Sequence, residues 1–294
     1  MTQPPGQPAG PEAHQPALPA CVRHPDRPTG LRCSRCDRPA CPECLRPASV
    51  GQHCVDCVAE GQRSTRRPVT VSGARVGSKP VVLPILVAVN LIVFVVTVVQ
   101  AQSLTNLNGS SLFVNWFLLP VAVRDGSWWQ LVTSGFLHVN PIHILMNMVA
   151  LWIIGRDMER VLGSLRFSIV YLLGLLGGSV AVFVFGQFDT PEAGASGAVF
   201  ALMGGLLVLV YKLKLNPGQV IGLIAVNLVI SVVIPGISLL GHVGGLVTGA
   251  AVTFALVNVP KQRRGLWQGV TVAVALVVLL GLVLVRLPGI PTTI

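Results

Sequence analysis

Residues 81–99 read VVLPILVAVNLIVFVVTVV and contain no charged side chain. An α-helix needs about 20 consecutive apolar residues to cross the hydrocarbon core of a bilayer. Of the whole chain, 52% is hydrophobic and 11% is charged, whereas a soluble domain carries roughly 25% charged residues. The stretch and the composition together predict a spanning helix and exclude a large soluble globular protein.

Six further apolar runs follow this first one and predict an all-α, polytopic membrane helix bundle. After Val81–Val99, the predicted spans are Phe136–Gly155, Phe167–Gly186, Ala195–Tyr211, Val220–Ile234, Leu239–Val257 and Leu266–Val285. We therefore expect a six-helix core over residues 80–258 and an additional C-terminal transmembrane helix over residues 266–286.

Basic residues are concentrated in alternate connections between the apolar runs. One set of connections carries 13 Lys and Arg residues, and the other set carries Arg124 and Arg286. The 13 are Arg63, Arg66, Arg67, Arg75, Lys79, Arg156, Arg160, Arg166, Lys212, Lys214, Lys261, Arg263 and Arg264. Because positive loops stay in the cytoplasm, the N-terminus is predicted inside and the C-terminus outside. Membrane orientation accounts for the +10 net charge, so nucleic-acid binding is not expected.

Seventeen Arg against four Lys, with abundant Ala, Gly and Val, is typical of a GC-rich bacterium. The expected location is therefore the plasma membrane. The residues before the bundle divide into three parts by composition. Residues 1–20 are predicted to be a disordered tail, residues 21–57 a Cys/His domain, and residues 58–79 a basic linker.

All seven cysteines lie in this N-terminal region, in four short pairs with one histidine. The pairs are Cys21-x-x-His24, Cys33-x-x-Cys36, Cys41-x-x-Cys44 and Cys54-x-x-Cys57. Such a pair offers two ligands from one tight turn, and four pairs supply two tetrahedral zinc sites. A disulfide framework is the alternative, but the odd number of cysteines and the predicted cytoplasmic location argue against it.

The spacing of the pairs resembles that of B-box-type zinc domains, in which two ions are bound in a cross-braced way. The resemblance implies two ligand sets, Cys21, His24, Cys41 and Cys44 for one ion and Cys33, Cys36, Cys54 and Cys57 for the other. His53, beside Cys54, is an alternative ligand. Closed four-ligand sites leave no position for a catalytic water, so the domain is expected to be structural or to bind a cytoplasmic protein partner.

Polar side chains inside three predicted spans are the candidates for chemistry, because ionisable groups are costly in a membrane. The second span carries His143 and Asn147, the fourth begins near Ser196, and the sixth carries His242. At about 1.5 Å per residue, these groups lie ~20–27 Å from the cytoplasmic ends of their helices. In a hydrocarbon core ~30 Å thick, they are expected to meet in the outer half.

A serine hydroxyl is a weak nucleophile unless a base removes its proton, and neutral His242 is a candidate base for Ser196. His143 and Asn147 are four residues apart and share one helix face. Together with the backbone N–H of Ser196, they are candidates to donate hydrogen bonds to an oxyanion. No Asp or Glu lies at this depth, so the pattern predicts a two-residue serine–histidine site.

These motifs together resemble the rhomboid family of intramembrane serine proteases, over about residues 81–258. They are His138-x4-His143-x3-Asn147, Gly194-x-Ser196-Gly197 and His242-x2-Gly245-x3-Gly249, with Gly155-x3-Glu159-Arg160 after the second span. The resemblance implies Ser196 as nucleophile, His242 as its base, and His143 and Asn147 in the oxyanion hole. It also implies transmembrane segments of other proteins as substrates. Phe200 stands where some members have a tyrosine stacked on the histidine, and a phenylalanine can still stack there.

Two other functions compete with this one. The first is a catalytically inactive rhomboid-like protein that binds membrane clients; such relatives usually lack the serine or the histidine, and both are present here. The second is a transporter whose histidines relay protons, but no internal repeat of the kind frequent in transporters is visible. The sequence therefore favours an endopeptidase with two structural zinc ions and no catalytic cofactor.

Overall fold

The computed structural model describes residues 17–65, 69–74 and 79–291. The chain divides into two compact units, Met1–Arg67 and Pro68–Ile294. Most of the predicted tail, residues 1–16, lies outside the described residues, as do Arg66, Arg67 and Arg75 of the predicted linker.

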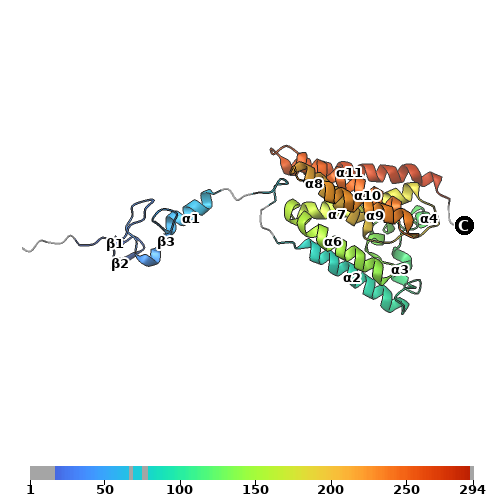
Figure 1. The fold of residues 1–294 in the computed structure, drawn as a ribbon, viewed down its shortest axis with the longest axis horizontal. Coiled ribbons are helices and arrows are strands. Elements are labelled where there is room, and N and C mark those ends of the chain that lie inside the picture. Colours follow the sequence, from blue (N-terminus) through green and yellow to red (C-terminus); the bar gives the residue numbers. More distant parts are fainter. Residues whose placement is uncertain (1–16, 66–68, 75–78, 292–294) are drawn as a thin grey trace, which may run out of the picture. The chain divides into compact units, whose positions relative to one another are not determined.

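The first unit consists of two small antiparallel hairpins followed by one helix (Figure 1). Its elements are β1 (Ala20–Cys21), β2 (His24–Pro28), the 3-10 turn η1 (Pro42–Cys44), β3 (Leu45–Pro47), β4 (Gln52–Cys54) and α1 (Val55–Ser64). The buried side chains that pack together are mostly cysteines, with Ala40 and Leu45. A unit this small cannot build a sufficient apolar core, so the cysteine clusters take its place.

The second unit is a bundle of long helices (Figure 1). The long helices are α2 (Val82–Ala101), α6 (Pro141–Leu162), α7 (Ser164–Phe185), α8 (Ser196–Lys212), α9 (Gly218–Val233), α10 (Leu239–Asn258) and α11 (Arg264–Arg286). The short ones are α3 (Ser111–Trp116), α4 (Pro120–Arg124), α5 (Gln130–Thr133), η2 (Ser134–Phe136) and η3 (Leu287–Gly289).

Each of the seven predicted spans overlaps one of the long helices, which confirms the predicted fold class of an all-α membrane bundle. Within the described residues, four helices are long and apolar enough to cross a membrane: α2, α7, α10 and the segment Arg264–Gly289. A fifth span results if η2 and α5 are counted with α6. Helices α8 and α9 are apolar but shorter, with 17 and 16 residues.

The predicted start of the second span, Phe136, is wrong. Helix α6 begins at Pro141, and the segment Gln130–Phe136 lies at 92° to it. The Asn140 side chain accepts a hydrogen bond from the His143 N–H at 2.8 Å, which caps the helix. Proline suits the first helical position because its ring fixes φ and the missing N–H would have no partner there.

Helices α7, α8 and α10 form the centre of the bundle. Helix α10 packs against both α7 and α8, and Phe167, Tyr171 and Phe183 of α7 are fully buried. The approach of α8 to α10 is close enough to need glycine, since a Cβ added at Gly245 would overlap the carbonyl group of Gly197. In lipid, such small residues let backbones approach and gain dispersion contacts.

Helix α11, which follows the six-helix core, is joined to the loops at one end of the bundle. The Arg124 guanidinium of α4 donates a hydrogen bond to the Ile290 carbonyl, and Arg286 stacks over the Phe188 ring at 4.9 Å. Ile290 belongs to a buried apolar cluster that also contains Leu118. The C-terminal helix therefore helps to fix the segment around Leu118.

The Glu159 carboxylate, near the end of α6, joins three helices. It accepts hydrogen bonds from the N–H groups of Val81, Val82 and Leu83 at 2.8, 2.9 and 2.8 Å. The Ser164 hydroxyl, in the first turn of α7, donates to the same carboxylate at 2.6 Å. The first N–H groups of a helix lack partners within it and carry partial positive charge, so a buried carboxylate stabilises the start of α2.

We predict that Glu159→Gln destabilises the bundle. The amide keeps the shape of the side chain but loses the charge, and its NH2 group faces N–H donors. We expect a loss of about 2 kcal/mol, which lowers the Tm of a unit this size by about 4–8 °C. Thermal unfolding in detergent measures it. Asp157→Asn is the matched control, because Asp157 is exposed and forms only a 3.7 Å ion pair with Arg160; equal Tm values for the two variants would contradict the capping role.

Candidate active site and metal centres

Ser196 is the first residue of α8, and backbone hydrogen bonds fix the segment that precedes it. Gly194 has φ +146°, a backbone conformation that residues other than glycine rarely adopt. Its N–H donates to the Ser134 carbonyl at 3.0 Å. Two residues earlier, Glu192 pairs with Leu118 through two backbone hydrogen bonds of 2.8 and 2.9 Å. Ser196 is thus fixed at a helix N-terminus, where the N–H groups have no partners within the helix.

His242 lies in the first turn of α10, beside the face of α8 that carries Ser196. Its ring stacks on the Phe200 ring, with 4.0 Å between centroids and 12° between planes. Phe200 thus stacks on the histidine, as the resemblance allows for a phenylalanine at this position. Since Phe200 follows Ser196 by four residues, both occupy one face of α8. In the described part of the chain, no hydrogen bond joins the Ser196 hydroxyl to His242; such bonds are often long in a free enzyme.

The two predicted oxyanion donors lie on α6, and His143 borders the space beside Ser196. A Cβ added at Gly194 would lie 3.0 Å from His143 Nε2 and 3.6 Å from Ser196 Oγ, so these atoms border one small space. Asn147 is buried and donates one amide hydrogen to the His143 carbonyl at 3.0 Å. An amide NH2 group has a second hydrogen, which stays available for a ligand.

His138 is fully buried, and its ring meets the His143 ring edge to face at 5.1 Å. The His138 side chain supports His143 by packing.

The structure adds one residue that the sequence analysis did not single out. Ser231 of α9 has its hydroxyl oxygen 2.6 Å from His242 Nδ1, and both side chains are buried. A serine inside an apolar helix gives little signal by itself. Only the packing of α9 against α10 brings it to the histidine.

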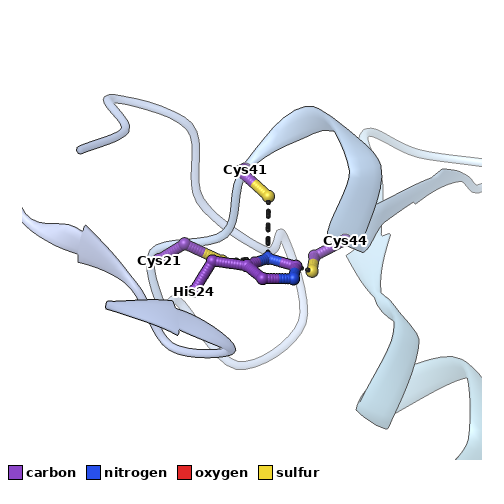
Figure 2. A group of neighbouring side chains, drawn as sticks. All are labelled: Cys21, His24, Cys41 and Cys44. Atoms are coloured by element: carbon purple, nitrogen blue, oxygen red, sulfur yellow. Dashed lines mark hydrogen bonds between the residues drawn. The ribbon is translucent and has the colours of Figure 1, made fainter. Parts of the chain in front are cut away.

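The eight predicted metal ligands form two groups of four in the N-terminal unit. The groups are Cys21, His24, Cys41 and Cys44, and Cys33, Cys36, Cys54 and Cys57. Within each, the ligand atoms all lie within 4.8 Å of one another. Figure 2 shows the first group, with three cysteine sulfurs around the His24 ring. This is the grouping that the resemblance to B-box domains implied, and His53 belongs to neither group.

The distances fit a tetrahedral metal site. His24 Nδ1 lies 3.9 Å from the Cys21 sulfur and 3.4 Å from those of Cys41 and Cys44. In the second group, the sulfurs of Cys36 and Cys54 are 3.8 Å apart. With metal–sulfur and metal–nitrogen bonds of about 2.3 and 2.0 Å, tetrahedral ligands lie about 3.5–3.8 Å apart. All seven cysteines are free of disulfide bonds.

The electrostatics of the first group also fit a cation. The backbone N–H of Cys41, with other hydrogen bonds, lowers the pKa of Cys21 to about 6. Burial and the neighbouring Cys41 and Cys21 thiols raise the pKa of Cys44 to about 11. Thiolates this close repel one another, and a bound dication removes that repulsion and keeps all the ligands deprotonated. The two groups can therefore bind metal ions.

The fold and the site define a multi-pass helical membrane protein with a serine and a histidine on adjoining helices. Residues 125–259 match the family model described as Rhomboid domain. That range includes the serine, the histidine and the two α6 donors, and it excludes the Cys/His groups. "Putative rhomboid protease YdcA" of Bacillus subtilis (strain 168) is 32% identical over 149 residues, which cover 49% of this chain and 74% of the relative. The chain belongs to the rhomboid family.

Other relatives agree with this assignment. "Rhomboid protease GluP" of Bacillus subtilis (strain 168) is 32% identical over 207 residues, which cover 69% of this chain and 39% of the relative. "Rhomboid protease AarA" of Providencia stuartii is 24% identical over 208 residues, which cover 61% of this chain and 73% of the relative. The chain spans less than half of the length of two similar relatives, 39% of GluP and 45% of "RHOMBOID-like protein 4" of Arabidopsis thaliana.

We predict that Cys41→Ser removes one of two bound metal ions per chain and unfolds the N-terminal unit alone. A serine hydroxyl is a poor metal ligand, and the N-terminal unit depends on its cysteine clusters because it has no large apolar core. Elemental analysis of the purified chain measures the metal, and limited proteolysis reports the folding. His53→Ala is the control and is expected to retain both ions. Full metal content in Cys41→Ser, or loss in His53→Ala, would show that the ligands are assigned wrongly.

Proposed function

We propose that the protein is a serine endopeptidase that hydrolyses peptide bonds in transmembrane segments of other membrane proteins. Ser196 is the nucleophile and His242 is its base. The observation that carries this proposal is the stacking of His242 on Phe200, on the face of α8 that carries Ser196. The family supports it as well, since several relatives are named rhomboid proteases.

The proposed reaction is acyl transfer in two halves. His242 Nε2 takes the hydroxyl proton of Ser196 as its oxygen attacks the carbonyl carbon of the scissile peptide bond. The tetrahedral intermediate then expels the amine, which receives the same proton from the imidazolium. Water attacks the resulting acyl-enzyme by the same route, which releases the acid and restores the serine.

The oxyanion of the intermediate needs donors that are already in place. Three are proposed: the Ser196 N–H at the start of α8, the second amide hydrogen of Asn147, and the His143 ring. The helix N-terminus adds a partial positive charge. The absence of a side chain at Gly194 supports this arrangement, because a Cβ there would occupy the space between His143 and the Ser196 hydroxyl.

A cavity of about 270 Å³ adjoins this site and offers a path for an extended substrate segment. Ala193, next to Gly194, and Val139, next to His138, line it, together with Phe113, Phe117 and Glu192. Thr105, Asn106 and Asn108 line it as well, so both apolar and polar side chains are available to contact a peptide segment. Burial raises the pKa of Glu192 above its usual value.

We assign zinc to the two Cys/His groups, because thiolate and imidazole ligands in tetrahedral sets select that ion. The ions would be structural, and the catalytic site needs no cofactor. The basic connections support an N-terminal unit in the cytoplasm and a C-terminus outside, in the plasma membrane of a bacterium. With the zinc-binding unit in the cytoplasm, its binding partner would be a cytoplasmic protein.

We predict that Ser196→Ala and His242→Ala each abolish cleavage of a transmembrane substrate, because the nucleophile or its base is removed. A fluorophosphonate probe is expected to label the wild type and neither variant. Ser168→Ala is the control, since Ser168 lies on α7 and bonds only to the Ser164 carbonyl. Turnover by purified Ser196→Ala at the wild-type rate would refute the dyad. A folded wild type without labelling or turnover would instead favour the client-binding function.

We also predict that Asn147→Ala lowers kcat by about 10²–10³-fold with little change in KM, as expected for one lost oxyanion donor. Steady-state kinetics in detergent or bicelles measures both constants. The Asn147→Ala variant also loses the hydrogen bond from the Asn147 amide to the His143 carbonyl, and we expect α6 to keep its position without it. A proportional rise in KM with unchanged kcat would place Asn147 in ground-state binding instead.

A further inference from the structure

Building on the proposed function, we infer that Ser231 is a positioning residue that holds His242 in the tautomer a general base needs. Ser231 lies on α9 and His242 on α10, so the contact joins two helices. The Ser231 oxygen is 2.6 Å from His242 Nδ1, and the two side chains are 5% and 6% exposed.

Counting hydrogens decides the direction of this hydrogen bond. The Ser231 hydroxyl has one hydrogen, and its oxygen also lies 2.7 Å from the Asn227 carbonyl oxygen. A carbonyl only accepts, so the hydroxyl hydrogen is donated to Asn227. The Ser231 oxygen must then accept from Nδ1–H. A neutral imidazole carries one hydrogen, and with that hydrogen on Nδ1 the Nε2 lone pair is free.

The opposite tautomer would fail on two counts. If Nε2 carried the hydrogen, it would have no lone pair for the Ser196 proton. Nδ1 would then face an oxygen whose only hydrogen is already engaged, and two lone pairs would meet in a buried site. The arrangement therefore selects the reactive tautomer and also aligns the ring.

The bond remains useful after proton transfer. The imidazolium keeps Nδ1–H on the Ser231 oxygen, which partly offsets the cost of the new charge. In serine hydrolases with a triad, a carboxylate serves this position. Among the described residues, no carboxylate forms a hydrogen bond or ion pair with His242; the ionisable group that acts on it is His143 of α6. A neutral hydroxyl avoids burying an anion within the membrane.

The rest of α9 shows that the inward position of Ser231 is specific. Ile224 and Ser231 are its buried residues, while Val232 and Val233 are 68% and 70% exposed. In an apolar helix, a serine without a partner would satisfy its hydroxyl on its own helix alone. Here the oxygen also receives the histidine N–H.

The test compares Ser231→Ala and Ser231→Thr with the wild type and with Ser168→Ala, which loses only a hydroxyl bond to its own helix. For Ser231→Ala we expect kcat and the rate of fluorophosphonate labelling to fall about tenfold, the effect of one buried hydrogen bond. KM is expected to stay within about twofold, because no substrate contact is lost. Threonine keeps the hydroxyl, so Ser231→Thr is expected to stay within about threefold of the wild type.

The inference is overturned if Ser231→Ala matches an active wild type, or if Ser231→Thr is as slow as the alanine variant. The ¹⁵N spectrum of labelled histidine in Ser196→Ala provides a readout that does not need activity. We expect Nδ1 of His242 to be protonated there, and a mixture of tautomers once Ser231 is also replaced by alanine. An Nε2-protonated ring would overturn the inference by itself. Absence of labelling in the wild type would count against the proposed function, and the spectrum would still decide the tautomer.

Discussion

The close approach of the α8 and α10 backbones is the constraint on which the site depends. No side chain fits between Gly245 and the Gly197 carbonyl, so the two helices meet backbone to backbone. At this separation, the Phe200 and His242 rings stack in full contact. Ser196 and His242, the proposed nucleophile and base, then need no long side chain to approach each other. In lipid, where apolar burial gives no driving force between helices, this contact is itself a source of stability.

Much of the architecture was predictable from the sequence, because apolar runs and Cys-x-x-Cys spacing are local patterns. The seven runs each overlap a helix, and the eight Cys/His ligands gather in two groups. What failed or was missed depends on contacts between distant segments. The true start of α6 at Pro141 rests on the Asn140 cap, which an apolar pattern does not register. The role of Ser231 appears only when α9 lies against α10, and no spacing in the chain connects Ser231 to His242.

The two units obtain their stability from different sources. In the N-terminal unit, cysteines occupy the positions that apolar residues fill elsewhere, and the two Cys/His groups can bind metal ions. Under the zinc assignment proposed above, the folding of this unit is linked to metal binding and to reduced thiols. The membrane unit has no cysteine and relies on helix packing and on buried polar links. One such link is the Glu159 carboxylate, which ties α2 and α7 to the end of α6. Loss of metal therefore acts on one unit without removing any contact described within the other.

The shallow burial of α9 has a consequence for motion. Its buried residues are Ile224 and Ser231, whereas α7, α8 and α10 interlock through their backbones. Local opening begins where few contacts must break, so fluctuations concentrate on α9 rather than within the central three helices. An outward excursion of α9 carries the Ser231 oxygen away from His242 and leaves the imidazole free to turn over between its tautomers. If His242 acts as the proposed base, its correct tautomer is therefore held only while α9 stays packed against α10.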